Sequence, residues 1–75
     1  MPKLPILRAR ELIKTLNKLG FKLYHQVGSH AQFKNPKGIK ITVPVHGKKE
    51  IGKKTLKGII NDLDITVEEF IKLSN

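Results

Sequence analysis

The chain has 75 residues, with fifteen Lys and Arg against six Asp and Glu, a net charge of +9, and no cysteine. This length fits one domain over residues 1–75, and the lack of thiols excludes disulfides, Cys-ligated zinc and cysteine nucleophiles. No stretch is apolar enough for a signal peptide or a membrane span, so we expect a cytoplasmic protein. The positive charge predicts a polyanionic partner, most commonly nucleic acid, although a lysine-rich surface that only maintains solubility has the same composition.

The first predicted element is an amphipathic helix over residues 9–19. Apolar residues recur at helical spacing from Leu12 to Leu19, and Gly20 is a typical residue just past a helix end. Arg8 stands where a Ser or Asp cap is expected, so the sequence signals the start of this helix only weakly.

Residues 21–27, 31–34 and 39–45 alternate between apolar and polar side chains and predict three antiparallel strands. The segment "NPKG" between the last two suits a type I turn with its glycine in the left-handed conformation. This turn would pair Phe33 with Ile41 and place both on one face.

The connection between the first two strands allows two registers. A turn made by "GS" alone would pair Val27 with His30. A three-residue loop, Gly28-Ser29-His30, would pair Val27 with Ala31. We favour the longer loop because it gathers the apolar side chains on one face, with His30 exposed beside the turn. The inward-facing residues would then be Phe21, Leu23, Val27, Ala31, Phe33, Ile39, Ile41 and Val43.

The same register assigns the polar residues of the strands. Tyr24, Gln26, Gln32 and Lys34 would share the outward face, either as RNA contacts or as an ordinary solvated surface. The parity of His25 places it on the inward face, where a partly buried or sheet-edge histidine is the plainest interpretation.

A second helix is predicted over about residues 53–62, from the apolar spacing between Leu56 and Leu63. Thr66 and Glu69 have the spacing of a capping box and predict a short last helix. The order is α-β-β-β-α plus this short C-terminal helix. It predicts an α+β fold, with a three-stranded antiparallel sheet and helices on one face.

Lysines cluster at the start of the second predicted helix: Lys53, Lys54 and Lys57 lie in its first turns, with Lys48 and Lys49 just upstream. A helix N-terminus offers unpaired N–H groups and a positive dipole end to a phosphate. Lysines there do not stabilise the helix, so the pattern favours phosphate binding over a merely solvated polar face.

This order of elements, with "KKTLK" opening the second helix, resembles the double-stranded RNA-binding domain, which carries a KKxxK-type run at that place. The resemblance implies that RNA is recognised by its shape and backbone. Taken alone it implies no catalytic residue.

A more specific resemblance covers nearly the whole chain. It is similar to the HicA toxin family, in the same order, through "RELIKTLNKLGF", "QVGSHAQFKNPKG", "ITVPVH", "KKEI", "TLKGII" and "DITVEEF". The resemblance implies an mRNA interferase with the double-stranded RNA-binding fold, an endoribonuclease that needs no metal or cofactor, arrests growth and is neutralised by a HicB-type antitoxin. The chain departs from the family at two helix starts, with Arg8-Ala9 in place of Ser-Gly and Lys53-Lys54 in place of Pro-Gly.

The resemblance also implies that His30, the histidine of Gly-Ser-His, is catalytic. RNA carries its own nucleophile, the 2′-OH, and an imidazole can remove that proton or protonate the leaving 5′ oxygen. Lysines nearby would stabilise charge on the phosphate. Ser29 is a candidate to hydrogen-bond the phosphate or orient the ring, and Gly28 to shape the turn. His46 is the candidate second proton-transfer group, although we slightly favour an exposed loop residue without a role.

Two other functions stay open on the sequence alone. The fold could bind duplex RNA through Lys53, Lys54 and Lys57 without cutting it, or the chain could be a decayed toxin that only binds an antitoxin. A steep loss of affinity with salt would indicate phosphate contacts.

Overall fold

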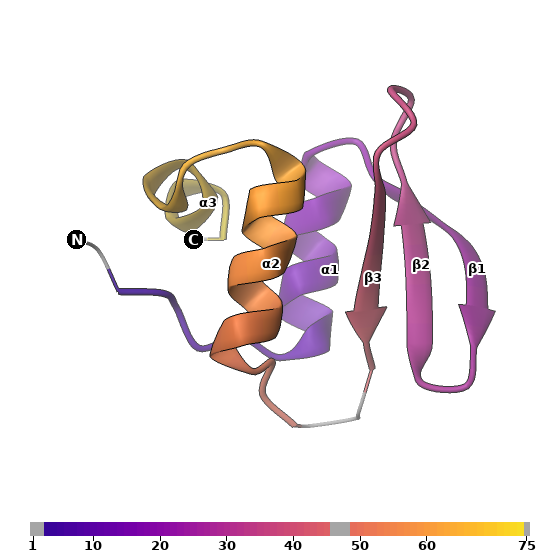
Figure 1. Ribbon diagram of the computed structural model, residues 1–75, viewed down its shortest axis with the longest axis horizontal. Coiled ribbons are helices and arrows are strands. Elements are labelled where there is room, and N and C mark those ends of the chain that lie inside the picture. The colour runs from indigo at the N-terminus through magenta and orange to yellow at the C-terminus, as the bar shows by residue number, and fades with distance from the viewer. Residues whose placement is uncertain (1–2, 46–48, 75) are drawn as a thin grey trace.

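The computed structural model describes residues 3–45 and 49–74. These parts form three helices and one three-stranded antiparallel sheet with strand order β1-β2-β3 (Figure 1). The predicted α+β order, including the extra C-terminal helix, is confirmed. In chain order the elements are α1 (Ala9–Lys18), β1 (Lys22–Val27), β2 (His30–Lys34), β3 (Lys40–Pro44), α2 (Lys53–Leu63) and α3 (Val67–Ser74).

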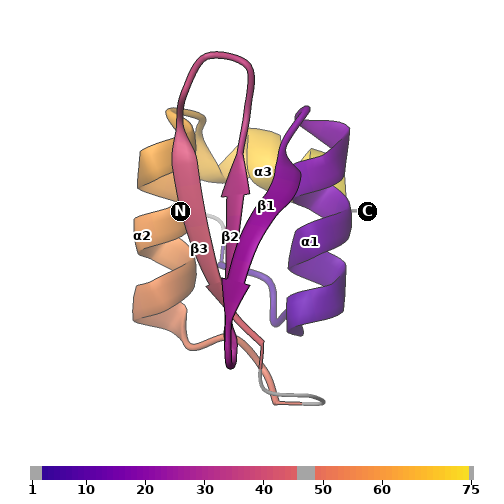
Figure 2. The same cartoon turned by 90° about the vertical axis from the view of Figure 1, so that its right-hand side faces the viewer.

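The helices cover one face of the sheet, as expected. Burial alternates along β2 and β3: Ala31, Phe33, Ile41 and Val43 are buried, and the residues between them are exposed or half-buried. We call the buried side the inner face and the helix-free side the outer face. β3 lies nearest to the helices and β1 forms the far edge (Figure 1), and the strands stand in front of α1 and α2 after a quarter turn (Figure 2).

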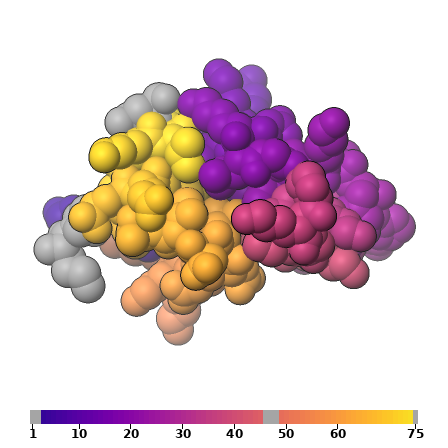
Figure 3. All heavy atoms as spheres, turned by 90° about the horizontal axis from the view of Figure 1, so that it is seen from above, coloured from indigo at the N-terminus to yellow at the C-terminus, as the bar shows by residue number. Residues whose placement is uncertain are grey.

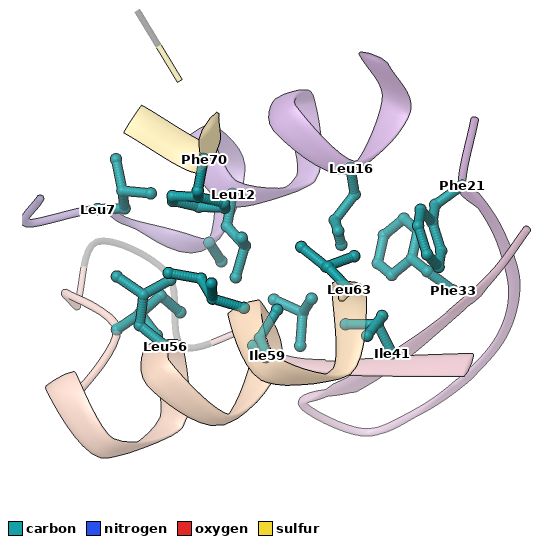
Figure 4. Close-up of a cluster of buried hydrophobic side chains, with 14 of the residues drawn as sticks. Leu7, Leu12, Leu16, Phe21, Phe33, Ile41, Leu56, Ile59, Leu63 and Phe70 are labelled. Carbon is teal, nitrogen blue, oxygen red and sulfur yellow. The ribbon is translucent and has the colours of Figure 1, made fainter. Parts of the chain in front are cut away.

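The core fills the space between the inner face and the helices. Leu16 and Leu63 meet Phe21 and Phe33 at one end of this core, while Phe70 of α3 packs near Leu12 at the other (Figure 4). From above, α3 lies beside α1 and α2, opposite the β2–β3 turn (Figure 3). Each fully buried side chain of this size contributes about 1.5–3 kcal/mol, so α3 is part of the folded unit.

The starts of α1 and α3 use acidic side chains. The backbone N–H of Arg8 donates to a Glu11 carboxylate oxygen at 2.9 Å, which compensates for the missing Ser or Asp cap of α1. At α3 the predicted capping box is confirmed: Thr66 N–H donates to Glu69 Oε1, and Glu69 N–H donates to Thr66 Oγ1, both at 3.1 Å.

The β2–β3 turn follows its sequence pattern. Phe33 pairs with Ile41, Gly38 has the left-handed φ of 87°, and its N–H donates to the Asn35 carbonyl at 3.0 Å. The Asn35 side chain also accepts a hydrogen bond from Ile39 N–H at 2.8 Å. The predicted register of this hairpin is therefore confirmed.

The predicted register of the β1–β2 hairpin is wrong. Val27 pairs with His30 and not with Ala31, so Gly28 and Ser29 alone form the turn. Gly28 has a φ of 55°, which suits the first position of a two-residue turn that begins with glycine. The pair of Val27 and His30 lies on the outer face, because Ala31 next to His30 is buried on the inner one.

A β-bulge between Leu23 and His25 explains the error. Tyr24 and His25 together stand opposite Gln32, so the parity of β1 changes at the bulge. His25 therefore lies on the outer face and not on the inner one, and Gln26, paired with Ala31, occupies an inner-face position and not the predicted outward one.

Leu23 and Val27, the two apolar residues of β1 that were predicted to be buried, are exposed. Leu23 is 52% exposed and Val27 is 59% exposed, and every residue of β1 is exposed. Leu23 pairs with Phe33 on the inner face, but β1 lies at the edge farthest from the helices (Figure 1), where no helix covers it.

Candidate functional site

The Gly28-Ser29 turn is held to the chain that leaves β3. The backbone N–H of Val45 donates to the Ser29 carbonyl oxygen at 2.6 Å, and Gln26 Nε2 donates to the Gly28 carbonyl at 3.2 Å. Ser29 is half-buried. These contacts fix the backbone immediately before His30.

His30 is the first residue of β2, and its side chain is exposed, as predicted. It pairs with Val27 on one side and Pro44 on the other. Neither neighbour carries a polar side-chain group, so the imidazole has open access to a ligand on the outer face. The strands hold its backbone in place, which is the arrangement that proton transfer to a bound substrate needs.

Further along the outer face, Tyr24 and His25 lie opposite Gln32. Tyr24 Oη donates to Gln32 Oε1 at 2.9 Å, which holds the phenol ring across the strands. The Tyr24 and His25 rings are 6.5 Å apart between centroids and tilted by 33°. Exposed aromatic rings of this kind can stack on unpaired bases.

Three lysines lie side by side on the three strands, at the end of the outer face farthest from the β1–β2 turn. Lys34 pairs with Lys22 on β1 and with Lys40 on β3, and all three are exposed. We call these residues the lysine row. Like charges directly opposite one another destabilise a sheet, so the row does not stabilise the fold and makes the outer face attractive to a polyanion.

Lys53, Lys54 and Lys57 are exposed on the first turns of α2, as expected. Gly52 precedes the helix without a side-chain cap, and the first turn holds no acidic residue. The backbone N–H groups there are therefore not covered by an anionic side chain, which leaves them available to a phosphate.

Two upstream candidates differ in status. Lys49 is exposed, whereas Lys48 and His46 lie outside the described residues.

The structure brings the turn and the α2 start to the same end of the molecule, in different layers. The β1–β2 turn and the beginning of α2 both lie at the lower end of Figures 1 and 2. The β2–β3 turn lies at the opposite, upper end (Figure 1). The α2 lysines belong to the helix layer, while His30 lies on the outer face of the sheet. The lysines and His30 are therefore at the same end of the molecule, but they do not form one continuous patch.

Within residues 3–45 and 49–74, no three His, Cys, Asp or Glu side chains gather in a way that could hold a metal ion. No helix in the same ranges is long and apolar enough to cross a membrane.

Sequence reasoning missed two features of the outer face. His25 was placed on the wrong side, because nothing in "KLYHQV" marks the bulge. Two of the three residues of the lysine row, Lys34 and Lys40, follow from the correctly predicted pairing of Phe33 with Ile41. The pairing of Lys22 with Lys34 depends on the register of β1, which was predicted wrongly.

The family comparison matches most of the chain. A family model described as the HicA toxin of bacterial toxin-antitoxin matches residues 9–65, which run from the start of α1 to just before α3. No curated protein matches the chain.

Proposed function

The chain belongs to the HicA toxin family of toxin–antitoxin systems, and we propose that it is an endoribonuclease that cleaves mRNA with His30 as a catalytic residue. The observation that carries the proposal is the exposed imidazole of His30 at the start of β2. The hydrogen bond from Val45 to Ser29 holds the backbone before it, and the α2 lysines begin at the same end of the molecule (Figure 1).

The proposed reaction uses the 2′-OH of the RNA as its nucleophile and needs no metal. Attack on the adjacent phosphorus releases a 5′-OH fragment and leaves a 2′,3′-cyclic phosphate. His30 either removes the 2′ proton or protonates the leaving 5′ oxygen, and one such transfer typically contributes 10²–10⁴-fold to a rate.

The proposed RNA grip uses charge more than base recognition. Lys53, Lys54 and Lys57 would neutralise phosphates beside the free N–H groups of α2, and Lys48 and Lys49 would add charge just before the helix. Ser29 would hydrogen-bond the scissile phosphate or orient the imidazole, and Gly28 would allow the turn. Contacts of this type recognise RNA by shape and backbone.

The proposed partner is a HicB-type antitoxin that covers His30 until it is degraded. Membership of a toxin–antitoxin family supports the presence of an antitoxin. The exposed outer face, which carries His30 beside Val27, offers the surface that such a partner would have to cover.

The test is incubation of the purified protein with a long unstructured RNA in EDTA, beside His30→Ala and the surface control Lys72→Ala. We expect fragments with cyclic phosphate ends from the wild type and from Lys72→Ala, and none from His30→Ala. His30→Ala should bind RNA and unfold at the wild-type temperature. Binding by all three proteins without cleavage would overturn the nuclease and leave an RNA-binding protein. Cleavage that requires added Mg²⁺ would overturn metal independence.

A further inference from the structure

His25 and His30 project from the same face of the sheet, although they lie on different strands. His25 pairs with Gln32, and His30 pairs with Val27, so the two histidines are diagonal neighbours on β1 and β2. Diagonal neighbours in an antiparallel pair lie about 7–8 Å apart, within reach of long and aromatic side chains. Both side chains are exposed.

The bulge is what produces this arrangement. In a regular β1, His25 would share the inner face with Leu23, and its imidazole would point away from His30. The extra residue of the bulge turns His25 to the outer face, beside the ring of Tyr24. Bulges of this kind re-aim side chains and are over-represented next to active sites.

The rest of the outer face supplies the setting for an RNA strand. Tyr24, held by Gln32, offers a ring for base stacking, and the lysine row, Lys22, Lys34 and Lys40, offers positive charge beyond it. These lysines and the Tyr24 phenol are the titratable groups of the described residues that share this face with the two histidines. A strand that reached from His30 to the lysine row would pass His25.

We propose that His25 is the second proton-transfer group of the nuclease, paired with His30 across the outer face. This rests on the proposed function, because it assigns a residue to that same cleavage reaction. One imidazole acts as the base and the other, in its protonated form, as the acid.

The reaction balances with these two groups alone. The neutral imidazole takes the proton of the 2′-OH as the 2′ oxygen bonds to phosphorus. The bond from phosphorus to the 5′ oxygen breaks, and the imidazolium gives its proton to that oxygen. The products are a 2′,3′-cyclic phosphate and a 5′-OH, with one proton accepted and one released by the protein.

The first experiment compares His25→Ala and His25→Phe with the wild type and with the surface control Lys72→Ala. It also includes His46→Ala, which removes the rival candidate for the second proton transfer. Single-turnover cleavage and RNA affinity are measured for each variant. We expect both His25 variants to cleave about 100-fold or more slowly with affinity within about twofold, and Lys72→Ala to cleave at the wild-type rate. Phenylalanine keeps an aromatic ring for stacking but carries no proton, so recovery of the rate in His25→Phe would overturn proton transfer by His25.

The second experiment separates the acid from the base. An RNA whose leaving 5′ oxygen is replaced by sulfur needs no acid, because a thiolate leaves without a proton. We expect one of His25→Ala and His30→Ala to recover near wild-type cleavage of this substrate, and the other to stay slow. Equal defects of both variants on the sulfur substrate would overturn the division of roles.

The outcomes distinguish this inference from the function on which it rests. If the wild type cuts, His30→Ala does not and His25→Ala cuts normally, the nuclease stands and His25 has no part in it. If His46→Ala, and not His25→Ala, loses the cleavage rate, the nuclease also stands and His25 is again not the second proton-transfer group. If the wild type does not cut RNA, both proposals fall. Unchanged thermal unfolding of the His25 variants, expected because the side chain is exposed, shows that a lost rate is not lost folding.

Discussion

The backbone N–H of Val45 donates a 2.6 Å hydrogen bond to the carbonyl oxygen of Ser29. This hydrogen bond joins the residue that follows β3 to the turn immediately before His30. The hydrogen bonds between β1 and β2 alone would not make this connection. The position of the proposed catalytic histidine therefore depends on the C-terminal end of β3 as well as on its own turn.

Val45→Pro tests this dependence, because proline keeps an apolar side chain but has no N–H to donate. We expect a loss of roughly 0.5–1.5 kcal/mol in unfolding free energy and a cleavage rate reduced well beyond that of Val45→Ala. Urea denaturation and single-turnover cleavage measure the two effects. The alanine variant keeps the N–H and loses packing instead, so equal rates in the two variants would show that the hydrogen bond does not position His30.

Lys54→Ala tests the proposed phosphate contacts at the start of α2. We expect weaker RNA binding and a plot of log affinity against log salt that is flatter by roughly 0.7–0.9 per lost contact. Lys72 is an exposed lysine of α3, a helix that lies away from the start of α2 (Figure 1). Lys72→Ala removes the same charge and should leave the slope unchanged. Equal slopes for both variants would place the RNA elsewhere.

Gly52→Asp should move stability and binding in opposite directions. Gly52 has a φ of −63° and precedes α2 without a side-chain cap, and a Cβ there meets nothing within 4 Å. An aspartate would cap the helix and favour its dipole by roughly 0.3–1 kcal/mol, but its carboxylate would occupy the N–H groups proposed for phosphate. Gly52→Ser caps without charge and should bind RNA more tightly than Gly52→Asp. Salt titrations and thermal unfolding of both variants check this.

Phe70→Ala tests whether α3 is required for folding. Phe70 is fully buried, although α3 begins after the residues that match the family. We expect a loss of about 3–5 kcal/mol, which is a large part of the 5–15 kcal/mol that typically separates folded from unfolded protein. Lys72→Ala on the same helix should stay within about 0.5 kcal/mol. A small effect of Phe70→Ala in circular dichroism melts would mean that α3 is only appended to the fold.

The parts of the fold that were predicted correctly carry short-range signals. The turn "NPKG" specifies its own geometry, so the pairing of Phe33 with Ile41 followed from it. Thr66 and Glu69 specify a helix start in the same local way. Each signal needs only neighbouring residues, and no distant element overrides it.

β1 was misplaced because its register depends on distant parts of the molecule. Hydrophobic alternation decides a register only where one face is covered, and the helices do not cover Leu23 or Val27. Burying these two side chains was the reason for choosing the longer loop. Without that coverage, the two-residue turn forms, and Gly28 can take its positive φ of 55° because it has no Cβ.

The residues of the candidate site could be predicted from the sequence, but their arrangement in space could not. The Gly-Ser-His motif and the lysines of "KKTLK" can be found in the printed sequence, and the exposure of His30 is confirmed. His30 lies in the sheet layer and the α2 lysines lie in the helix layer, and this arrangement depends on how the sheet packs against α2. The place of His25 depends on a single extra residue in β1, which leaves no mark in the composition of that strand.

The bulge in β1 has a further consequence at the open edge of the sheet. β1 is an outermost strand, and an exposed outer strand presents peptide groups to which a strand of another molecule could add. An irregular, bent strand that carries lysine is a poor template for such pairing, and β1 has both the bulge and Lys22. The extra residue that turns His25 outward thus also makes β1 a poor template for pairing between molecules, and we expect a variant with a straight β1 to aggregate more readily.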